Sequence, residues 1–152
     1  MRVAIVGSGP SGFYAASRIL HSFDAQCGTG ENGVDIHMYE RLPTPFGLVR
    51  YGVAPDHPEV RNVENKFDEV ARDPRFTFLG NVQVTGGADV LSSAAVPVPL
   101  SCMAPYYTHI LFAYGASDAR HLHLPGTGPD GLQHIHTAFD FVQWYNGHPD
   151  AH

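Results

Sequence analysis

The sequence predicts an α/β fold in which a parallel β-sheet lies between two outer layers, three layers in all. Two observations lead to this fold class. Short apolar runs rich in β-branched residues alternate along the chain with longer amphipathic segments, and a glycine-rich turn joins the first apolar run to the first helical pattern. At 152 residues the chain is long enough for one domain with its own core, so we expect a single unit over residues 1–152.

The amino-terminal part predicts a complete βαβ unit. Arg2–Val6 (RVAIV) is a β-branched apolar run that ends at a glycine, which is typical of a buried parallel strand before a tight turn. Ser11–Ser22 has apolar and small residues at helical spacing, with Pro10 where a first helical turn tolerates it. Asp24–Gly33 is polar and rich in glycine, so it predicts a loop, and the alternating Val34–Tyr39 predicts the second parallel strand.

The rest of the chain continues the alternation of strands and helices. Leu42–Pro58 carries four prolines and two glycines, so it predicts an ordered loop wrapped over another part of the molecule. The further elements that we expect are a helix at Glu59–Asp73, short strands at Phe76–Leu79 and Val82–Val84, an irregular stretch at Gly86–Pro105, a strand at Tyr106–Tyr114 and a capped helix at Thr137–Asn146.

The amino-acid composition limits the kinds of molecule that we expect the chain to bind. The net charge is -6 and the nine Lys and Arg residues are scattered, which argues against a nucleic-acid surface. No apolar run approaches the roughly 20 residues of a membrane-spanning helix, so we expect a soluble chain. The first strand begins at the second residue, so we expect no targeting segment within this sequence.

Cysteine and histidine spacing does not predict a metal centre. Cys27 and Cys102 are far apart and form neither a metal-spaced pair nor a redox motif. Two histidine pairs are spaced two residues apart, namely His121 with His123 and His134 with His136, but no cysteine or carboxylate completes either set. We therefore expect no metal site.

The glycine-rich turn is a candidate diphosphate site. Gly7, Gly9 and Gly12 form G-x-G-x-x-G between the first strand and the first helix, as nucleotide binding requires. The first glycine permits the turn, the second lets the backbone approach a diphosphate, and the third lets helix and strand pack closely. The helix N-terminus then offers free N–H groups and the positive end of its dipole.

The end of the second strand supplies a candidate ribose ligand. Glu40 follows this strand, where a carboxylate accepts hydrogen bonds from the ribose hydroxyls of an adenosine and repels a 2′-phosphate. FAD or NAD is therefore favoured over NADP. Arg41 leaves an alternative open, since an adjacent guanidinium could bind a phosphate instead.

Several stretches give the chain a family resemblance. They are GSGPSGFYAA at residues 7–16, ERLPTPFGLVRYGVAPDHPEVRNV at residues 40–63, and the shorter GNVQV, FAYGA and WYNGHP. In these stretches the chain closely resembles adrenodoxin reductase and its fungal and bacterial relatives, which are FAD-containing NADPH:ferredoxin reductases. The resemblance covers nearly the whole chain except Asp24–Gly33 and Thr85–Pro105.

The resemblance implies a cofactor, partners and a set of site residues. It implies a Rossmann-like FAD-binding domain, incomplete relative to the family, with NADP(H) and a 2Fe-2S ferredoxin or adrenodoxin as the partners of the complete protein, and a mitochondrial matrix location. The residues that it places at the FAD site, together with the neighbours considered above, are Gly7, Gly9, Pro10, Ser11, Gly12, Glu40, Arg41, Leu48, Arg50, Val84, Tyr114, Gly115 and Ala116.

Two of the candidate residues have alternatives of equal weight. Arg50 lies in the proline-rich loop and could pair with a phosphate, or it could form a local ion pair with Asp56 or Glu59. His57 could face the flavin ring and take part in proton transfer as a catalytic residue, or it could cap the following helix or lie in solvent.

The sequence lacks parts that the family would lead us to expect. It contains no second G-x-G-x-x-G that directly joins a predicted strand to a predicted helix, as an NADPH site would need, and no basic surface for ferredoxin. Two hypotheses follow: the FAD-binding part of an NADPH:ferredoxin reductase, or a non-catalytic remnant of that fold that serves as a subunit of a larger complex. A dithiol flavoenzyme is disfavoured because residues 13–22 hold no cysteine, and a simple NAD-dependent dehydrogenase ranks last because it would not carry the long proline-rich loop.

Overall fold

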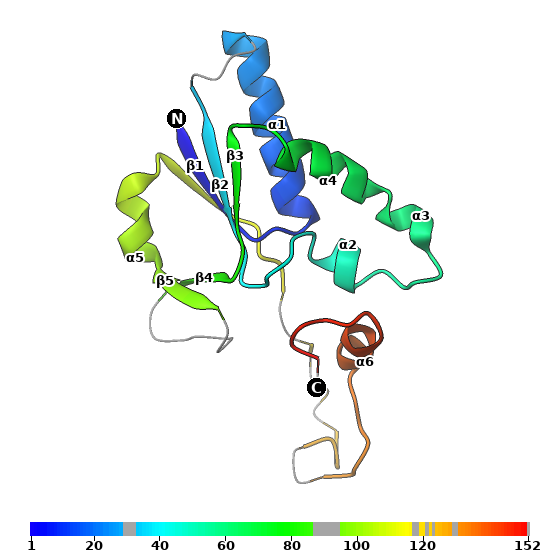
Figure 1. Cartoon of the computed structure of the whole chain (residues 1–152). Helices are drawn as coiled ribbons and strands as arrows, with labels where there is room; N and C mark the ends of the chain where they lie inside the picture. The colour runs from blue at the N-terminus through cyan, green and yellow to red at the C-terminus, as the bar shows by residue number, and fades with distance from the viewer. Residues whose placement is uncertain are drawn as a thin grey trace.

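The computed structural model describes most of the chain. The described residues are 1–28, 33–86, 95–116, 119–120, 122, 124–128 and 131–151. Four parallel strands at the centre of the molecule form the main sheet, with helices along one face (Figure 1).

The main sheet brings the ends of its strands to one edge. Its strands are β1 (Arg2–Val6), β2 (Asp35–Tyr39), β3 (Phe76–Leu79) and β6 (His109–Phe112), in the spatial order β3-β2-β1-β6. Val6 pairs with both Tyr39 and Phe112, so the carboxyl ends of β1, β2 and β6 lie level with one another. Ligands of open parallel sheets bind beyond such an edge.

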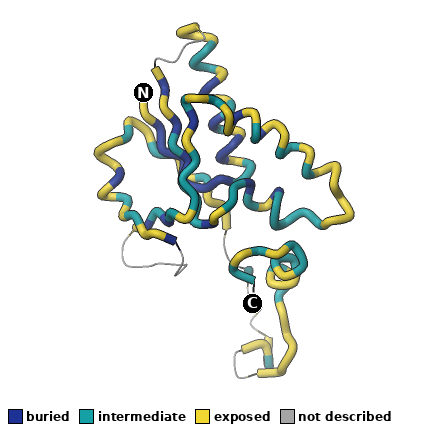
Figure 2. Tube along the Cα trace, viewed as in Figure 1, coloured by how far each residue is buried: buried dark blue, intermediate teal, exposed yellow. Residues whose placement is uncertain are grey.

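Two helices cover the inner face of the sheet. They are α1 (Pro10–Cys27) and α4 (Val63–Ala71), and aromatic side chains fill the space between them and the strands. Phe13 of α1 stacks on Phe67 of α4 with ring centroids 4.9 Å apart, and Phe46 meets Phe13 at 5.2 Å. Figure 2 shows the buried residues gathered in the sheet and along the adjoining side of α1.

A smaller layer covers the opposite face of the sheet. It contains a parallel pair, β4 (Val82–Thr85) with β5 (Val96–Pro99), followed by α5 (Leu100–Met103) and a 3₁₀ turn at Ala104–Tyr106. The hydroxyl of Tyr107 then bonds with Nδ1 of His37, at 2.7 Å, and with the hydroxyl of Tyr39 on this face of β2. The molecule is thus the three-layer α/β fold with a parallel sheet that the sequence predicts.

The proline-rich loop and the carboxyl-terminal part contain short helices. These are α2 (Leu48–Tyr51), α3 (Pro58–Arg61) and α6 (Ala138–Tyr145). At the start of α6, Thr137 Oγ1 accepts from the backbone N–H of Asp140, whose carboxylate in turn accepts from the N–H of Thr137, so the predicted cap is a complete capping box. No helix of the described residues is long and apolar enough to cross a membrane.

Three predicted elements have other bounds in the structure. The first helix runs on to Cys27, because tertiary contacts hold its last turn: the carboxylate of Asp24 binds Arg75, which precedes β3. The helix predicted at Glu59–Asp73 is interrupted at Asn62, between α3 and α4. The predicted strand Tyr106–Tyr114 shortens to β6, because Tyr107 bonds to the outer face of β2 instead of extending the ladder.

The irregular stretch predicted at Gly86–Pro105 contains β5 and α5. Its prolines led to the wrong expectation, because proline cannot donate a ladder hydrogen bond and is confined to edge strands. Pro97 and Pro99 are compatible with β5, which has β4 as its one partner among the described strands.

Candidate functional site

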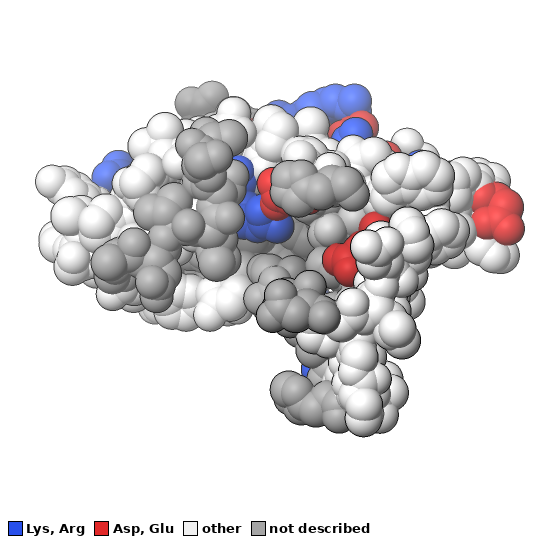
Figure 3. Space-filling model, turned by 90° about the horizontal axis from the view of Figure 1, so that it is seen from below, with Lys and Arg blue, Asp and Glu red and all other residues white. Residues whose placement is uncertain are grey.

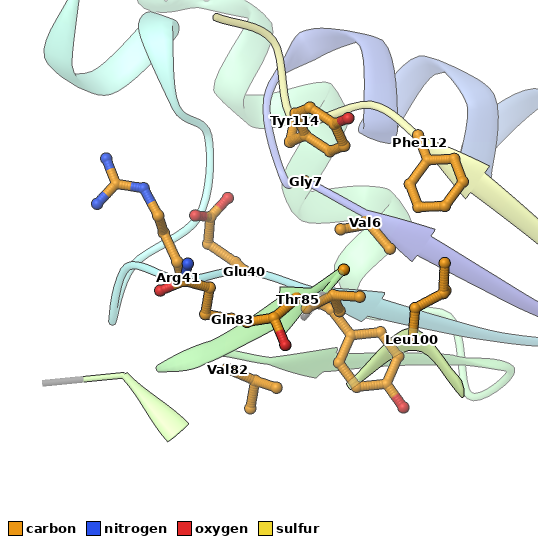
Figure 4. Close-up of a pocket in the computed structure, with 13 residues that line it drawn as sticks. Val6, Gly7, Glu40, Arg41, Val82, Gln83, Thr85, Leu100, Phe112 and Tyr114 are labelled. Carbon is orange, nitrogen blue, oxygen red and sulfur yellow. The ribbon is translucent and has the colours of Figure 1, made fainter. Parts of the chain in front are cut away.

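A cavity of about 440 Å³ lies beyond the carboxyl ends of the strands. Three parts of the chain line this cavity: the turn after β1, the residues at the ends of β2 and β6, and the strand β4 with the start of α5. Figure 4 shows Phe112 and Tyr114 on one side and Thr85 and Leu100 on the other. The lining residues are Val6, Gly7, Tyr39, Glu40, Arg41, Val82, Gln83, Val84, Thr85, Gly86, Leu100, Phe112 and Tyr114.

Two glycines of the amino-terminal turn are required by the fold. Gly7 has a φ of +106°, and a Cβ there would lie 2.5 Å from Cα of Tyr114. A Cβ at Gly12 would overlap the carbonyl oxygen of Gly7, so only glycine lets α1 start this close to the end of β1. The first and third glycines therefore act as the motif predicts.

The second glycine leaves space for a ligand. Gly9 is the N-cap of α1, with an ordinary φ of -74°, and a Cβ there would meet nothing within 4 Å. No side chain caps this end of α1, and its first turn holds no acidic residue. The amides of Ser11 and Gly12 thus belong to the first turn of a helix of 18 residues, at its positive dipole end. Of the predicted turn residues Gly7 lines the cavity, whereas Gly9, Pro10, Ser11 and Gly12 do not. Pro10 stands at the first helical position, where a missing N–H costs nothing.

Glu40 is fixed beside this turn by three hydrogen bonds. Its Oε2 accepts from the backbone N–H of Ser8 at 2.9 Å and from the Ser8 hydroxyl at 2.7 Å. Its Oε1 accepts from the N–H of Leu42 at 3.1 Å. Ser8 is fully buried. Ser8 was not among the residues predicted for the site, although a hydroxyl residue between the first two glycines of the motif was a visible signal.

Arg41 lines the cavity next to Glu40 but is already engaged. Its guanidinium forms an ion pair with the carboxylate of Asp150, a residue that the sequence analysis did not single out. In Figure 4 the guanidinium lies on the far side of Glu40 from Gly7. His148 is close to the same corner: burial lowers its pKa, and the charge of Arg41 lowers it further against the opposing charges of Asp150 and Glu40.

The predicted residues after β4 and β6 fall into two groups. Val84 and Tyr114 line the cavity, and Tyr114 is 66% exposed at its mouth. Gly115, with a φ of +69°, and the exposed Ala116 continue the turn after β6 but are not part of the cavity lining.

The proline-rich loop places its predicted residues away from the cavity lining. Leu48 is 66% exposed at the start of α2. The Nε of Arg50 donates to the carbonyl of Pro45 at 3.1 Å, and its guanidinium lies over the ring of Phe46 at 5.3 Å. The ion pairs among the described residues include none from Arg50 to Asp56 or Glu59.

His57 occupies the N-cap position of α3. Its side chain is 61% exposed, and its Nδ1 lies 3.2 Å from Oε1 of Glu59. His57 does not line the cavity of the described residues.

The described histidines form no metal cluster. His134 and His136 line a second, more open cavity with Arg120 and Asp140, and no group of three metal-ligating residues occurs in the part of the chain that the structure describes. His121 and His123 lie outside the described residues. Figure 3 views the molecule from below and shows Lys and Arg in small separate groups on the described part of this face.

Comparison with known proteins identifies relatives along nearly the whole chain. The chain is 44% identical over 150 residues to NADPH-ferredoxin reductase FprA of Mycobacterium leprae, a match that covers 99% of this chain and 29% of that protein. It is 43% identical over 150 residues to the mitochondrial NADPH:adrenodoxin oxidoreductase of Arabidopsis thaliana, covering 99% of this chain and 27% of that one. No family model matches the chain.

Solved structures agree with the sequence relatives. The fold superposes on Mycobacterium tuberculosis FprA in complex with NADPH with a TM-score of 0.78 and 41% identity, over 97% of this chain and 29% of that chain. The chain spans less than a third of the length of the relatives it matches. In sequence and in fold the chain is thus similar to one part of the NADPH-ferredoxin and NADPH:adrenodoxin reductases.

Proposed function

We propose that this chain is the FAD-binding part of an NADPH:ferredoxin oxidoreductase of the adrenodoxin reductase type. One observation carries the proposal: Gly7, two residues before the uncapped N-terminus of α1 at Gly9, lines a cavity together with Glu40, which is held at the end of β2. Both halves of an adenosine diphosphate thus have a complementary group, N–H donors for the phosphates and a carboxylate for the ribose.

The size of the cavity favours the adenosine diphosphate half of FAD. Its volume of about 440 Å³ is in the lower part of the range of roughly 300–1,000 Å³ that is usual for small-molecule sites. In the proposed arrangement Gly7, Gly9, Pro10, Ser11 and Gly12 surround the diphosphate. Glu40 accepts hydrogen bonds from the ribose.

The other predicted residues have supporting roles in the proposal. Val84 and Tyr114 flank the nucleotide, and Gly115 and Ala116 continue the turn beside it. Leu48 and Arg50 belong to the loop that would cover the flavin. His57 would hold or release a proton near the flavin ring.

FAD, when bound, supplies the conversion of a two-electron hydride donor into single electrons for an iron-sulfur protein. This chain's residues bind and orient FAD: the turn holds the diphosphate, and Glu40 holds the ribose. Ser8 keeps the carboxylate of Glu40 in place through two hydrogen bonds. We propose NADP(H) and a 2Fe-2S ferredoxin as the partners of the complete protein, and the mitochondrial matrix as its location. Relatives from plants, yeast and fish carry a mitochondrial name, whereas the mycobacterial relatives do not.

A non-catalytic subunit is the second candidate function. The observation that favours it is that Gly7–Gly12 is the one G-x-G-x-x-G of this sequence placed directly between a predicted strand and a predicted helix, which leaves NADPH without a recognisable site in this sequence. In that case the glycines serve the packing of α1 on β1, and a larger complex covers the exposed apolar side chains.

Reconstitution with FAD separates the two functions. The purified chain is incubated with FAD, passed through a desalting column and examined for flavin absorbance, with Gly9→Val as the control variant. We expect the wild-type chain to retain flavin and the variant to lose it, because a larger side chain fills the space at Gly9. A colourless, folded wild-type chain would refute the FAD proposal and support the structural subunit. NADPH-dependent reduction of a dye then tests whether the flavin-loaded chain has any activity of its own.

A further inference from the structure

The carboxyl-terminal residues form a strap that returns to the nucleotide cavity. This strap, residues 146–151, follows α6 and packs beside α2. Asn146 is its main anchor: its Nδ2 donates to the carbonyl of Tyr51 at 3.0 Å, and its Oδ1 accepts from Nη2 of Arg61 at 3.0 Å. The ring of His148 meets the ring of Tyr51 edge to face at 4.8 Å.

These contacts of Asn146 and His148 place Asp150 beside Arg41, a residue of the cavity wall. The backbone N–H of Asp150 donates to Nδ1 of His148 at 3.1 Å, and its carboxylate forms the ion pair with Arg41. The Arg41 side chain is only 21% exposed and that of Asp150 39% exposed, so the pair is better shielded than a typical surface ion pair. The strap thus contacts Arg41 of the cavity wall, which lies 109 positions before Asp150 in the sequence.

Arg41 is the one cation among the residues that line this cavity in the described structure. A guanidinium is the side chain best suited to bind a phosphate with two parallel hydrogen bonds. Its neighbour in sequence, Glu40, is placed to receive a ribose. An unpaired Arg41 would therefore bind a phosphate group close to the ribose. When Arg41 is paired with Asp150, the carboxylate compensates the positive charge that would attract this phosphate.

We propose that Asp150 is a specificity-determining residue, which holds Arg41 in an ion pair so that the cavity accepts adenosine with a free ribose 2′-hydroxyl and rejects 2′-phosphorylated adenosine. The inference rests on the proposed nucleotide site and adds a residue to it. Glu40 and Asp150 act together. Glu40 repels a 2′-phosphate, and Asp150 forms an ion pair with the Arg41 guanidinium that would otherwise attract this phosphate.

The test compares two ligands that differ by one phosphate. ADP-ribose and 2′-phospho-ADP-ribose are titrated calorimetrically into the whole chain and into Asp150→Ala. We expect the wild-type chain to prefer ADP-ribose, and we expect Asp150→Ala to bind the 2′-phosphorylated ligand about tenfold more tightly than wild type does, because one charge-assisted contact becomes available. Affinity for ADP-ribose should be unchanged, and adding Arg41→Gln to Asp150→Ala should abolish the gain.

Two further variants separate position from charge. Asp68→Ala removes one carboxylate from α4, where Asp68 pairs with Arg72 in solvent, so it changes the net charge as Asp150→Ala does. It should leave the preference unchanged. Asn146→Ala keeps the net charge but releases the strap, so it should shift the preference in the same direction as Asp150→Ala.

The outcomes distinguish the inference from the proposed function. An equal shift in Asp150→Ala and Asp68→Ala, or no shift in Asp150→Ala, overturns the role of Asp150 while the nucleotide site stands. Failure of ADP-ribose to bind the folded wild-type chain refutes the nucleotide site and this inference with it.

Discussion

Three glycines in one turn have separable tasks at the level of single residues. Gly12 is required for packing, since a Cβ there would overlap the carbonyl oxygen of Gly7. Gly9 has an ordinary φ of -74° and open space beside it, so the fold does not need a glycine there. A glycine that the fold does not require is best explained by the space that it leaves for a ligand.

Alanine substitution should therefore affect the two glycines differently. We expect Gly9→Ala to change the free energy of unfolding by less than about 0.5 kcal/mol and to weaken FAD binding at least about tenfold, through loss of one close approach to the diphosphate. We expect Gly12→Ala to lower the free energy of unfolding by about 1–3 kcal/mol, in spite of the better helix propensity of alanine. Urea unfolding and flavin titration measure the two effects. Similar losses of stability in both variants would contradict the division of tasks.

Two half-buried histidines predict how stability depends on pH. Burial holds the pKa of His37 and of His148 below the ordinary value of 6.5. The unfolded chain then binds protons at a higher pH than the folded chain does, so the free energy of unfolding should be greatest above pH 6.5 and should fall as the pH drops from 6.5 toward the lowered pKa values. Urea midpoints across this window measure the slope. His37→Gln with His148→Gln should flatten it, and an unchanged slope would contradict the assignment.

At the level of elements, α4 is attached to α1 chiefly through aromatic stacking. Phe67 is 1% exposed and lies between Phe13, at 4.9 Å, and Phe46, at 5.8 Å. We expect Phe67→Ala to lower the free energy of unfolding by about 3–5 kcal/mol, the usual cost of truncating a buried Phe. Val60→Ala, on the exposed side of α3, is the control and should cost less than about 0.5 kcal/mol. Equal midpoints in urea would show that α4 is not part of the core.

The elements show which features sequence patterns predict well. The pattern of Arg2–Val6, the glycine turn and Val34–Tyr39 is local, so the βαβ unit could be predicted from the sequence. The end of α1 and the strand β5 depend on distant partners, Arg75 for the first and β4 for the second. Sequence periodicity cannot predict such partners, because tertiary contacts override the local preference for a secondary structure.

The same division applies to the candidate site. Gly7, Glu40, Arg41, Val84 and Tyr114 line the cavity as expected from their places at strand ends. Asp150 could not be predicted, because nothing in its local sequence indicates that a strap brings it back to Arg41.

At the level of the whole molecule, a large part of the apolar surface remains exposed. Phe141 and Trp144 of α6 stack on each other and are 58% and 65% exposed, and Phe112 and Tyr114 at the cavity mouth are 52% and 66% exposed. Figure 2 shows α6 and the segment before it as mainly exposed or intermediate. Large apolar side chains that are exposed in this way are candidates for an interaction site.

The exposed surface of α6 should bind an apolar dye. We expect the folded chain to enhance the fluorescence of anilinonaphthalene sulfonate and Phe141→Ser with Trp144→Ser to reduce the enhancement, because the stacked pair is removed without a change in charge. Circular dichroism checks that the double variant keeps its fold. Undiminished fluorescence in a folded double variant would place the dye site elsewhere.

The proposed function requires that the turn before α1 and the end of β2 bind an adenine dinucleotide. The most direct measurement is a ¹⁵N–¹H correlation spectrum of the labelled chain recorded as FAD is added. A dinucleotide bound there should cause saturable shifts that are largest at the amides of Gly9, Ser11, Gly12 and Glu40. Shifts confined to other parts of the chain, or no shift at saturating FAD, would contradict it.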